Sequence, residues 1–258
     1  MKKLITIIAG DPKSINAEII LKAYKKTKKK FLIIGDKNIL KKQFLKLKNR
    51  FSLNVITNLD KINNNLNILN VKNTNLKSSS YILDCFEIAH DLAKKKKING
   101  FINAPVNKKI LKNKYHGITE YLAKKNNVSG KEIMMIYNSK LAVVPLTTHI
   151  PIKLVNKKIK TQLILNKISR LSKYYKKLFN KKPKIAILGL NPHNDENRFD
   201  SVENKIIIPA IKKLKNKKIS VKGPFPADTA FNKNNRKNYF TCKKEKNSRY
   251  GKNGYRPW

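Results

Sequence analysis

The chain of 258 residues is predicted to have an α/β fold built around a mostly parallel sheet. Short apolar runs that end at turn residues alternate along the sequence with stretches of helical periodicity. Continuous apolar runs are typical of buried parallel strands, and their alternation with amphipathic helices is typical of α/β layers. Hydrophobic residues make up 40% of the chain, enough for a core in one large domain or two modest ones.

The predicted strands share an apolar run that stops at glycine, proline or a polar turn, and they are residues 4–9, 31–34, 98–103, 132–137, 141–145 and 184–189. The predicted helices share an apolar face, and they are residues 14–28, 80–96, 156–179 and a helix that begins after Ser201. We expect a hairpin turning at Asn138 and Ser139, a helix beginning at Pro105, and a kink at Pro209.

Helical spacing also predicts which side chains face the core. In the first helix these are Ile15, Ile19 and Tyr24, and in the second helix Cys85 lies on the apolar face. The inward residues predicted for the long third helix are Leu165, Ile168, Leu171, Tyr175 and Leu178. Cys85 and Cys242 have no CxxC neighbour, which excludes a zinc ribbon and argues against a disulfide framework.

The net charge of +44 is the strongest compositional signal. It permits a basic nucleic-acid-binding protein as an alternative function. However, the basic residues are almost all lysines, they are spread over every predicted helix and loop, and they accompany abundant Asn and Ile. Those three amino acids share A/T-rich codons, so we favour a bias of the genome as the cause and expect no nucleic-acid partner. A positive field would still attract an anionic, phosphorylated substrate.

The apolar run at residues 4–9 is too short to span a bilayer and continues directly into Gly10-Asp11-Pro12. We interpret it as a buried first strand and expect a cytoplasmic protein without a membrane partner. The turn at Gly10 is also a place where backbone N–H groups could meet a phosphate. It is not a GxGxxG fingerprint, and no Walker motif is present, so the cofactor-binding residues stay unassigned.

Two histidines follow the ends of predicted strands. His149 comes after residues 141–145, and His193 comes after residues 184–189. In α/β sheets the crevice beyond the carboxyl ends of the strands is the usual ligand site, so a divalent metal or a substrate could bind there. Asp228 follows a double-proline turn at residues 223–226 and could act beside a metal or move a proton. The alternative role for Asp228 is a helix N-cap.

Six segments in order resemble the 4-hydroxythreonine-4-phosphate dehydrogenase family of vitamin B6 biosynthesis. They span roughly residues 1–231, and they are Gly10-Asp11-Pro12 with Glu18, residues 103–108, residues 117–123, residues 147–151, residues 188–193 and residues 223–229. The resemblance implies a two-domain α/β/α fold like that of isocitrate and isopropylmalate dehydrogenases. It also implies NAD-dependent oxidation of a phosphorylated substrate's secondary alcohol, followed by loss of carbon dioxide, in a homodimer.

The resemblance carries particular residues with it. His149 and His193 stand where the family has two ligands of a divalent metal such as Zn, Mg or Co. Asp228 matches a catalytic aspartate, and Thr119 matches a substrate-binding residue. On this basis we expect a first domain at residues 1–128, a second at residues 129–231 and an aberrant basic tail at residues 232–258.

The sequence departs from the family at two places that concern the site. Ile118 replaces a histidine, which leaves open either a substitute role for His116 or a related decarboxylating dehydrogenase of phosphorylated threonate. No histidine follows His193, so the family's third metal ligand has no counterpart, and we expect a chain cut short at its C-terminal end with doubtful activity. In such a chain the first domain would also lack its C-terminal return.

Overall fold

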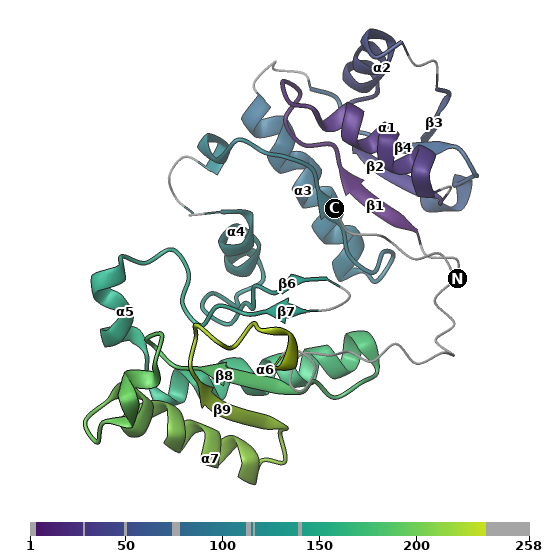
Figure 1. Ribbon diagram of the computed structural model, residues 1–258. Coiled ribbons are helices and arrows are strands. Elements are labelled where there is room, and N and C mark those ends of the chain that lie inside the picture. Colours follow the sequence, from purple (N-terminus) through teal and green to yellow (C-terminus); the bar gives the residue numbers. More distant parts are fainter. Residues whose placement is uncertain are drawn as a thin grey trace. The chain divides into compact units, whose positions relative to one another are not determined.

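The computed structural model describes all residues except 1–3, 28, 49–50, 74–77, 112–114, 116, 139–140 and 236–258. The chain divides into two compact units, Met1–Tyr121 and Leu122–Trp258 (Figure 1). Each unit has its own strands and its own hydrophobic core, so the two are described separately.

The first unit contains a five-stranded, entirely parallel sheet of order β3-β4-β2-β1-β5. Its strands are β1 (Ile5–Ile8), β2 (Phe31–Gly35), β3 (Leu53–Ile56), β4 (Leu66–Asn70) and β5 (Ile102–Asn103). The central strand β2 is buried along its whole length, as expected of a strand with neighbours on both edges and helices on both faces.

Helices cover both faces of this sheet. They are α1 (Asn16–Thr27), α2 (Lys37–Lys46), α3 (Ser78–Lys94) and, at the end of the unit, the start of α4 (Ile118–Lys125). One face packs Ile7 and Ile33 against Ile20 of α1 and Phe44 of α2. On the opposite face the buried Leu32 belongs to a cluster with side chains of α3, so the unit has three layers.

The second unit has two small sheets instead of one large one. β6 (Ile136–Tyr137) and β7 (Ala142–Val143) form an antiparallel hairpin, while β8 (Ile185–Leu188) and β9 (Val221–Phe225) form a parallel pair. The helices α5 (Ile152–Lys158), α6 (Thr161–Phe179) and α7 (Ile208–Asn216) complete the unit. Its core joins Ile164 and Leu165 of α6 to Ile211 and Leu214 of α7 and Val221 of β9.

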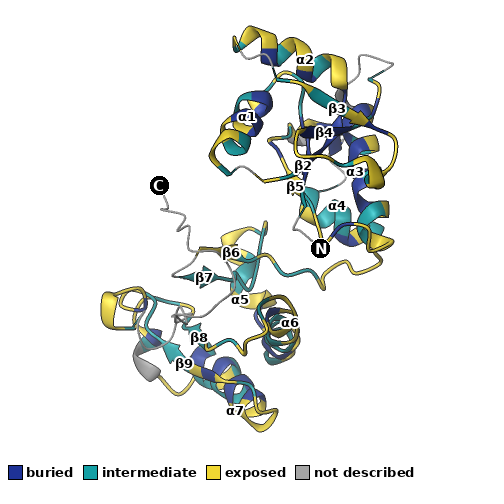
Figure 2. Ribbon diagram, turned by 90° about the vertical axis from the view of Figure 1, so that its right-hand side faces the viewer, coloured by how far each residue is buried: buried dark blue, intermediate teal, exposed yellow. Residues whose placement is uncertain are grey.

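A largely apolar groove of about 600 Å³ lies in the second unit. It is lined by the chain of β7 and the residues that follow it, by β8, and by one side of α6 with Ile168 and Leu171. In the described part of the chain β8 pairs only with β9. The groove therefore leaves all four residues of β8 only partly buried, which Figure 2 shows as teal strands.

Most elements predicted from the sequence are confirmed, although every predicted strand except the one at residues 31–34 is shorter than expected. The hairpin is confirmed, with the Asn138 N–H donating to Leu141 O at 2.9 Å. Ser201 Oγ accepts from Asn204 N at 3.2 Å, as a cap does. The kink expected at Pro209 takes the form of a π-helical turn at Glu203–Ile207, directly before α7.

Three predictions of local structure were wrong. No helix begins at Pro105, where a 3-10 turn at Lys108–Leu111 follows instead. The long helix predicted at 156–179 is two helices, because the chain is extended at Ile159 and Lys160 between α5 and α6. The double-proline turn at 223–226 is largely β9, with Pro224 inside the strand.

Two predicted inner faces were displaced by about one residue. Because α1 begins at Asn16, its buried apolar side chains are Ala17, Ile20 and Leu21, while Ile15 and Ile19 are exposed. In α6 Leu178 is 69% exposed. Phe179 takes the inner position and stacks on Tyr137 of the hairpin, with ring centroids 5.3 Å apart.

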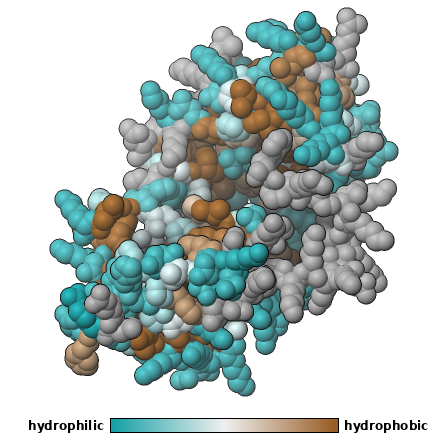
Figure 3. Space-filling model, in the orientation of Figure 1, coloured by the Kyte–Doolittle hydropathy of each residue, from teal (hydrophilic) through white to brown (hydrophobic). Residues whose placement is uncertain are grey.

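The surface is rich in hydrophilic side chains. On the face drawn in Figure 3 they cover much of both units and surround several apolar patches. None of the helices in the described ranges is long and apolar enough to cross a bilayer. Of the predicted tail, residues 233–235 form a single helical turn, and residues 236–258 lie outside the described part.

Candidate active site

His193 and Asp228 meet in the second unit. β8 and β9 are parallel, so their carboxyl ends lie at the same edge of the sheet. His193 follows β8 by five residues and Asp228 follows β9 by three. The imidazole Nδ1 lies 3.4 Å from Asp228 Oδ2, and both side chains are open to solvent. Two of the residues singled out from the sequence are therefore in contact.

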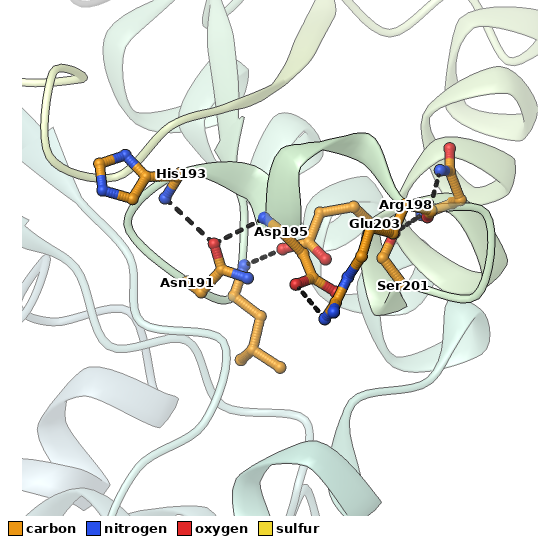
Figure 4. Close-up of polar contacts among 8 residues, drawn as sticks. Asn191, His193, Asp195, Arg198, Ser201 and Glu203 are labelled. Atoms are coloured by element: carbon orange, nitrogen blue, oxygen red, sulfur yellow. Dashed lines mark hydrogen bonds and ion pairs between the residues drawn. The ribbon is translucent and has the colours of Figure 1, made fainter.

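Asn191 shapes the loop that carries His193. Its side-chain Oδ1 accepts hydrogen bonds from the backbone N–H of His193 at 3.0 Å and of Asp195 at 2.7 Å (Figure 4). Asparagine side chains often close such turns by bonding to the backbone two or more residues ahead. The loop is closed further along by an ion pair between Asp195 and Arg198. His193 therefore stands on a turn whose backbone is hydrogen-bonded internally.

A buried carboxylate lies under the same loop. Glu203 is 1% exposed, and its Oε1 accepts from the backbone N–H of Leu190 at 2.7 Å (Figure 4). Burial of a carboxylate is costly unless hydrogen bonds satisfy it, so this contact with the end of β8 stabilises both partners. Glu203 was not predicted from the sequence as a site residue. Its only signal was its position two residues after the predicted cap Ser201.

His149 also lies in the second unit, after β7, in an exposed position with a backbone φ of +55°. The described residues contain no group of three or more His, Cys, Asp or Glu side chains that could hold a metal ion. The structure thus brings His193 and Asp228 together but does not gather His149 with them into a three-ligand cluster.

Asp228 lies in a turn rather than at the start of a helix. Its Oδ1 accepts from the backbone N–H of the next residue, Thr229, at 2.6 Å, and the other oxygen faces His193. The first N-cap after it is Asn232, whose Oδ1 accepts from Asn235 N at 2.8 Å. The helix-cap alternative for Asp228 is therefore wrong.

Thr119 belongs to the first unit. It is exposed in the first turn of α4, directly after Ile118, where the helix begins. Backbone N–H groups and hydroxyls at the start of a helix favour anionic groups. His116, the possible substitute for the family's histidine, lies outside the described residues.

Two backbone donors of the turn at Gly10 are already bonded within the chain. The N–H of Asp11 bonds to Pro105 O at 3.1 Å, and the N–H of Ser14 bonds to Asp11 O at 3.1 Å. Asn16 fills the space beside Gly10 and donates to the same Pro105 carbonyl at 3.1 Å. These bonds tie the turn to the chain that follows β5, so its role in this structure is to join two strand ends.

The distance between His193 Nδ1 and Asp228 Oδ2 is one that two ligands of the same metal ion could have. Two ligands about 2.1 Å from one ion in tetrahedral geometry lie roughly 3.4 Å apart, which is the separation seen here. Two donors alone hold an ion weakly, and resident sites use three or four. The pair therefore fits part of a divalent-metal site and equally fits a base held beside an imidazole.

Comparison with known proteins identifies the lineage. Residues 27–242 match the family described as pyridoxal phosphate biosynthetic protein PdxA. The chain belongs to this family. Its relatives include the 4-hydroxythreonine-4-phosphate dehydrogenase of Sulfurihydrogenibium sp., which is 32% identical over 89% of this chain and 76% of its own length. The enzyme of the same name from Aquifex aeolicus is 34% identical over 94% of this chain and 80% of its own.

A solved structure agrees with these relatives. The crystal structure of 4-hydroxythreonine-4-phosphate dehydrogenase from Klebsiella pneumoniae superposes with a TM-score of 0.82 at 25% identity, covering 93% of this chain and 79% of that one. The resemblance drawn from the six sequence segments is confirmed, and so is the α/β fold. The chain is thus an oxidoreductase of a family named for pyridoxal phosphate biosynthesis.

Proposed function

We propose that the chain oxidises 4-phosphohydroxy-L-threonine with NAD as hydride acceptor, after which the β-keto acid formed loses carbon dioxide. The observation that carries this proposal is the contact of His193 with Asp228 at the carboxyl ends of β8 and β9. Both residues lie in segments that resemble the family, and the relatives' names supply the substrate.

Asp228 is the residue we propose to move the proton. Oxidation of a secondary alcohol removes a hydride from the carbon and a proton from the hydroxyl; NAD⁺, when bound, supplies the hydride acceptor. An exposed carboxylate within reach of the hydroxyl can take the proton.

A divalent metal such as Zn, Mg or Co is the second cofactor we propose, with His149 and His193 as ligands. When bound, it supplies a Lewis acid toward the substrate's oxygen atoms. The support is the resemblance, in which both histidines stand where the family has metal ligands. Further ligands must come from the substrate, from water or from residues outside the described part.

Two other features of the chain favour a substrate that carries a phosphate. Thr119 stands exposed in the first turn of α4 and is the residue we propose to bind substrate. The net charge of +44 provides a positive field for an anionic substrate. We also propose a homodimer, on the resemblance alone, and a cytoplasmic location.

The test is NADH formation by the purified chain with 4-phosphohydroxythreonine and each of the three metals in turn. Threonate 4-phosphate serves as the second substrate, because Ile118 leaves substrate choice open. We expect faster turnover with 4-phosphohydroxythreonine. Turnover with threonate 4-phosphate alone would replace the proposed substrate, and no NADH with either compound and any metal would overturn the proposed function.

A further inference from the structure

A buried asparagine follows His193 directly. Asn194 is only 5% exposed, whereas the His193 side chain is 73% exposed. Asn194 and Asp195 both have left-handed backbone conformations, with φ of +57° and +50°. Asparagine tolerates this conformation better than most residues. The chain thus turns sharply just after His193 and sends the next side chain inward.

The Asn194 side chain ties the two halves of the site together. Its Nδ2 donates to the carbonyl oxygen of Pro224 at 3.1 Å. Pro224 belongs to β9 and precedes Asp228 by four residues. The bond therefore links the loop that carries His193 to the strand that leads to Asp228, over 30 residues of sequence.

The space for this side chain depends on Gly189 at the end of β8. A Cβ at this position would collide with Asn194 Oδ1 and would lie 2.9 Å from Glu203 Oε1. Asn194 Oδ1 is buried and has no hydrogen-bond partner among the described residues. A buried carbonyl oxygen left unpaired is destabilising, and such groups in native proteins call for an explanation. The hydrogen bond from Asn194 Nδ2 to Pro224 O explains why Oδ1 is left unpaired, because that bond holds the side chain in the orientation that buries Oδ1.

We propose that Asn194 is a positioning residue that sets the separation between His193 and Asp228. It does so in two ways, by turning the backbone after His193 and by fixing that turn to β9. The inference rests on the proposed function only in taking His193 and Asp228 as the functional pair. Their relative position can be measured whether or not the chain turns over substrate.

The decisive variant is Asn194→Gly. Glycine adopts the left-handed conformation without strain, so this change removes the side-chain tie and keeps the backbone turn available. Asn180→Gly is the matched control, because Asn180 has a φ of +53° at the exposed C-terminus of α6, away from the loop. Crystal structures of both variants and the parent chain give the distance from His193 Nδ1 to Asp228 Oδ2.

We expect this distance to grow by at least about 1 Å in Asn194→Gly and to stay near 3.4 Å in Asn180→Gly. An unchanged 3.4 Å contact in Asn194→Gly would overturn the proposal. This result is independent of metal and substrate, so it remains decisive if the proposed function fails.

Cobalt binding, followed by the absorption of the bound ion, gives a second readout. Changes in residues that orient a ligand typically lower metal affinity about 10- to 100-fold, and we expect this of Asn194→Gly. In a His193→Ala background the same change should have no further effect, because Asn194 acts through His193. An equal loss of affinity in both backgrounds would indicate general destabilisation and would contradict the positioning role.

Discussion

The two units bury their strands to different degrees. In the first unit β2 has a strand on each edge and a layer of helices on each face, and Leu32, Ile33 and Ile34 are completely buried. In the second unit β8 borders the groove and is partly exposed along its whole length, and among the described residues it pairs with β9 alone. The contrast between dark blue and teal strands is visible in Figure 2.

This difference in burial predicts which residues determine the stability of the chain and which determine its activity. A strand packed on both faces and both edges, such as β2, contributes most to the free energy of unfolding, because its apolar side chains are removed from water. The partly buried strands of the second unit contribute less, and their carboxyl ends carry His193 and Asp228. We therefore expect changes in the first unit to affect stability and changes at the ends of β8 and β9 to affect activity.

The largest effect is expected at Asp228. The change Asp228→Asn keeps the size of the side chain but removes its charge and its ability to take a proton. General-base catalysis typically contributes about 10²- to 10⁴-fold, so we expect kcat to fall by at least roughly 100-fold. Urea unfolding should be unchanged, because Asp228 is exposed. Asp200→Asn, at another exposed aspartate of the second unit, is the control and should keep full activity.

Matched truncations in the two sheets test the difference in burial. Ile33→Ala in β2 creates a cavity in a packed core and should lower the free energy of unfolding by about 2–5 kcal/mol. Ile187→Ala in β8 removes a side chain that is only partly buried, and about 1 kcal/mol is expected. Urea titrations followed by circular dichroism measure both. An equal loss of unfolding free energy in the two variants would contradict the inferred difference between the two units.

Cys85 provides a chemical probe of the first unit. It is a free thiol, 1% exposed, on the inner side of α3. In a Cys242→Ser background, a thiol reagent should leave the folded chain unmodified and react only as urea opens the first unit. Rapid labelling without urea would show that this core is not closed. A chain with Cys85→Ala in the same background measures reaction at other groups.

A smaller effect concerns pH. Burial raises the pKa of the Cys85 thiol from 9.0 to about 12. The unfolded chain then loses this proton at lower pH than the folded chain. The thiol's contribution to stability is therefore fully present below about pH 9 and declines as pH rises toward about 12. Free energies of unfolding at about pH 8 and about pH 10.5 should differ less in Cys85→Ala than in the parent chain.

The sequence predicted three of the five strands of the first unit, and the hairpin, because each is a local pattern with a clear end. The strands β3 and β4 were missed, because Asn54 and Asn67 interrupt their apolar runs. It misjudged inner faces where the starting residue of a helix decides the phase, as at Ile15 and Ile19. It also joined α5 to α6, because the break at Ile159 carries neither glycine nor proline.

The candidate site could be predicted in part. His193 and Asp228 were found because each follows a strand or a turn at the carboxyl edge of the sheet. Glu203 and Asn194 were missed, because their importance comes from contacts across the fold with Leu190 and Pro224. A hydrogen bond between residues 30 positions apart leaves no periodic signal in the sequence.

The most direct test of the account is the stoichiometry of the reaction. The purified chain with 4-phosphohydroxythreonine, NAD⁺ and a divalent metal should form NADH and carbon dioxide in equal amounts, and Asp228→Asn should lower both together. Formation of NADH and carbon dioxide at an undiminished rate by Asp228→Asn, or no NADH from the parent chain, would contradict the assignment of the dehydrogenase site to the ends of β8 and β9.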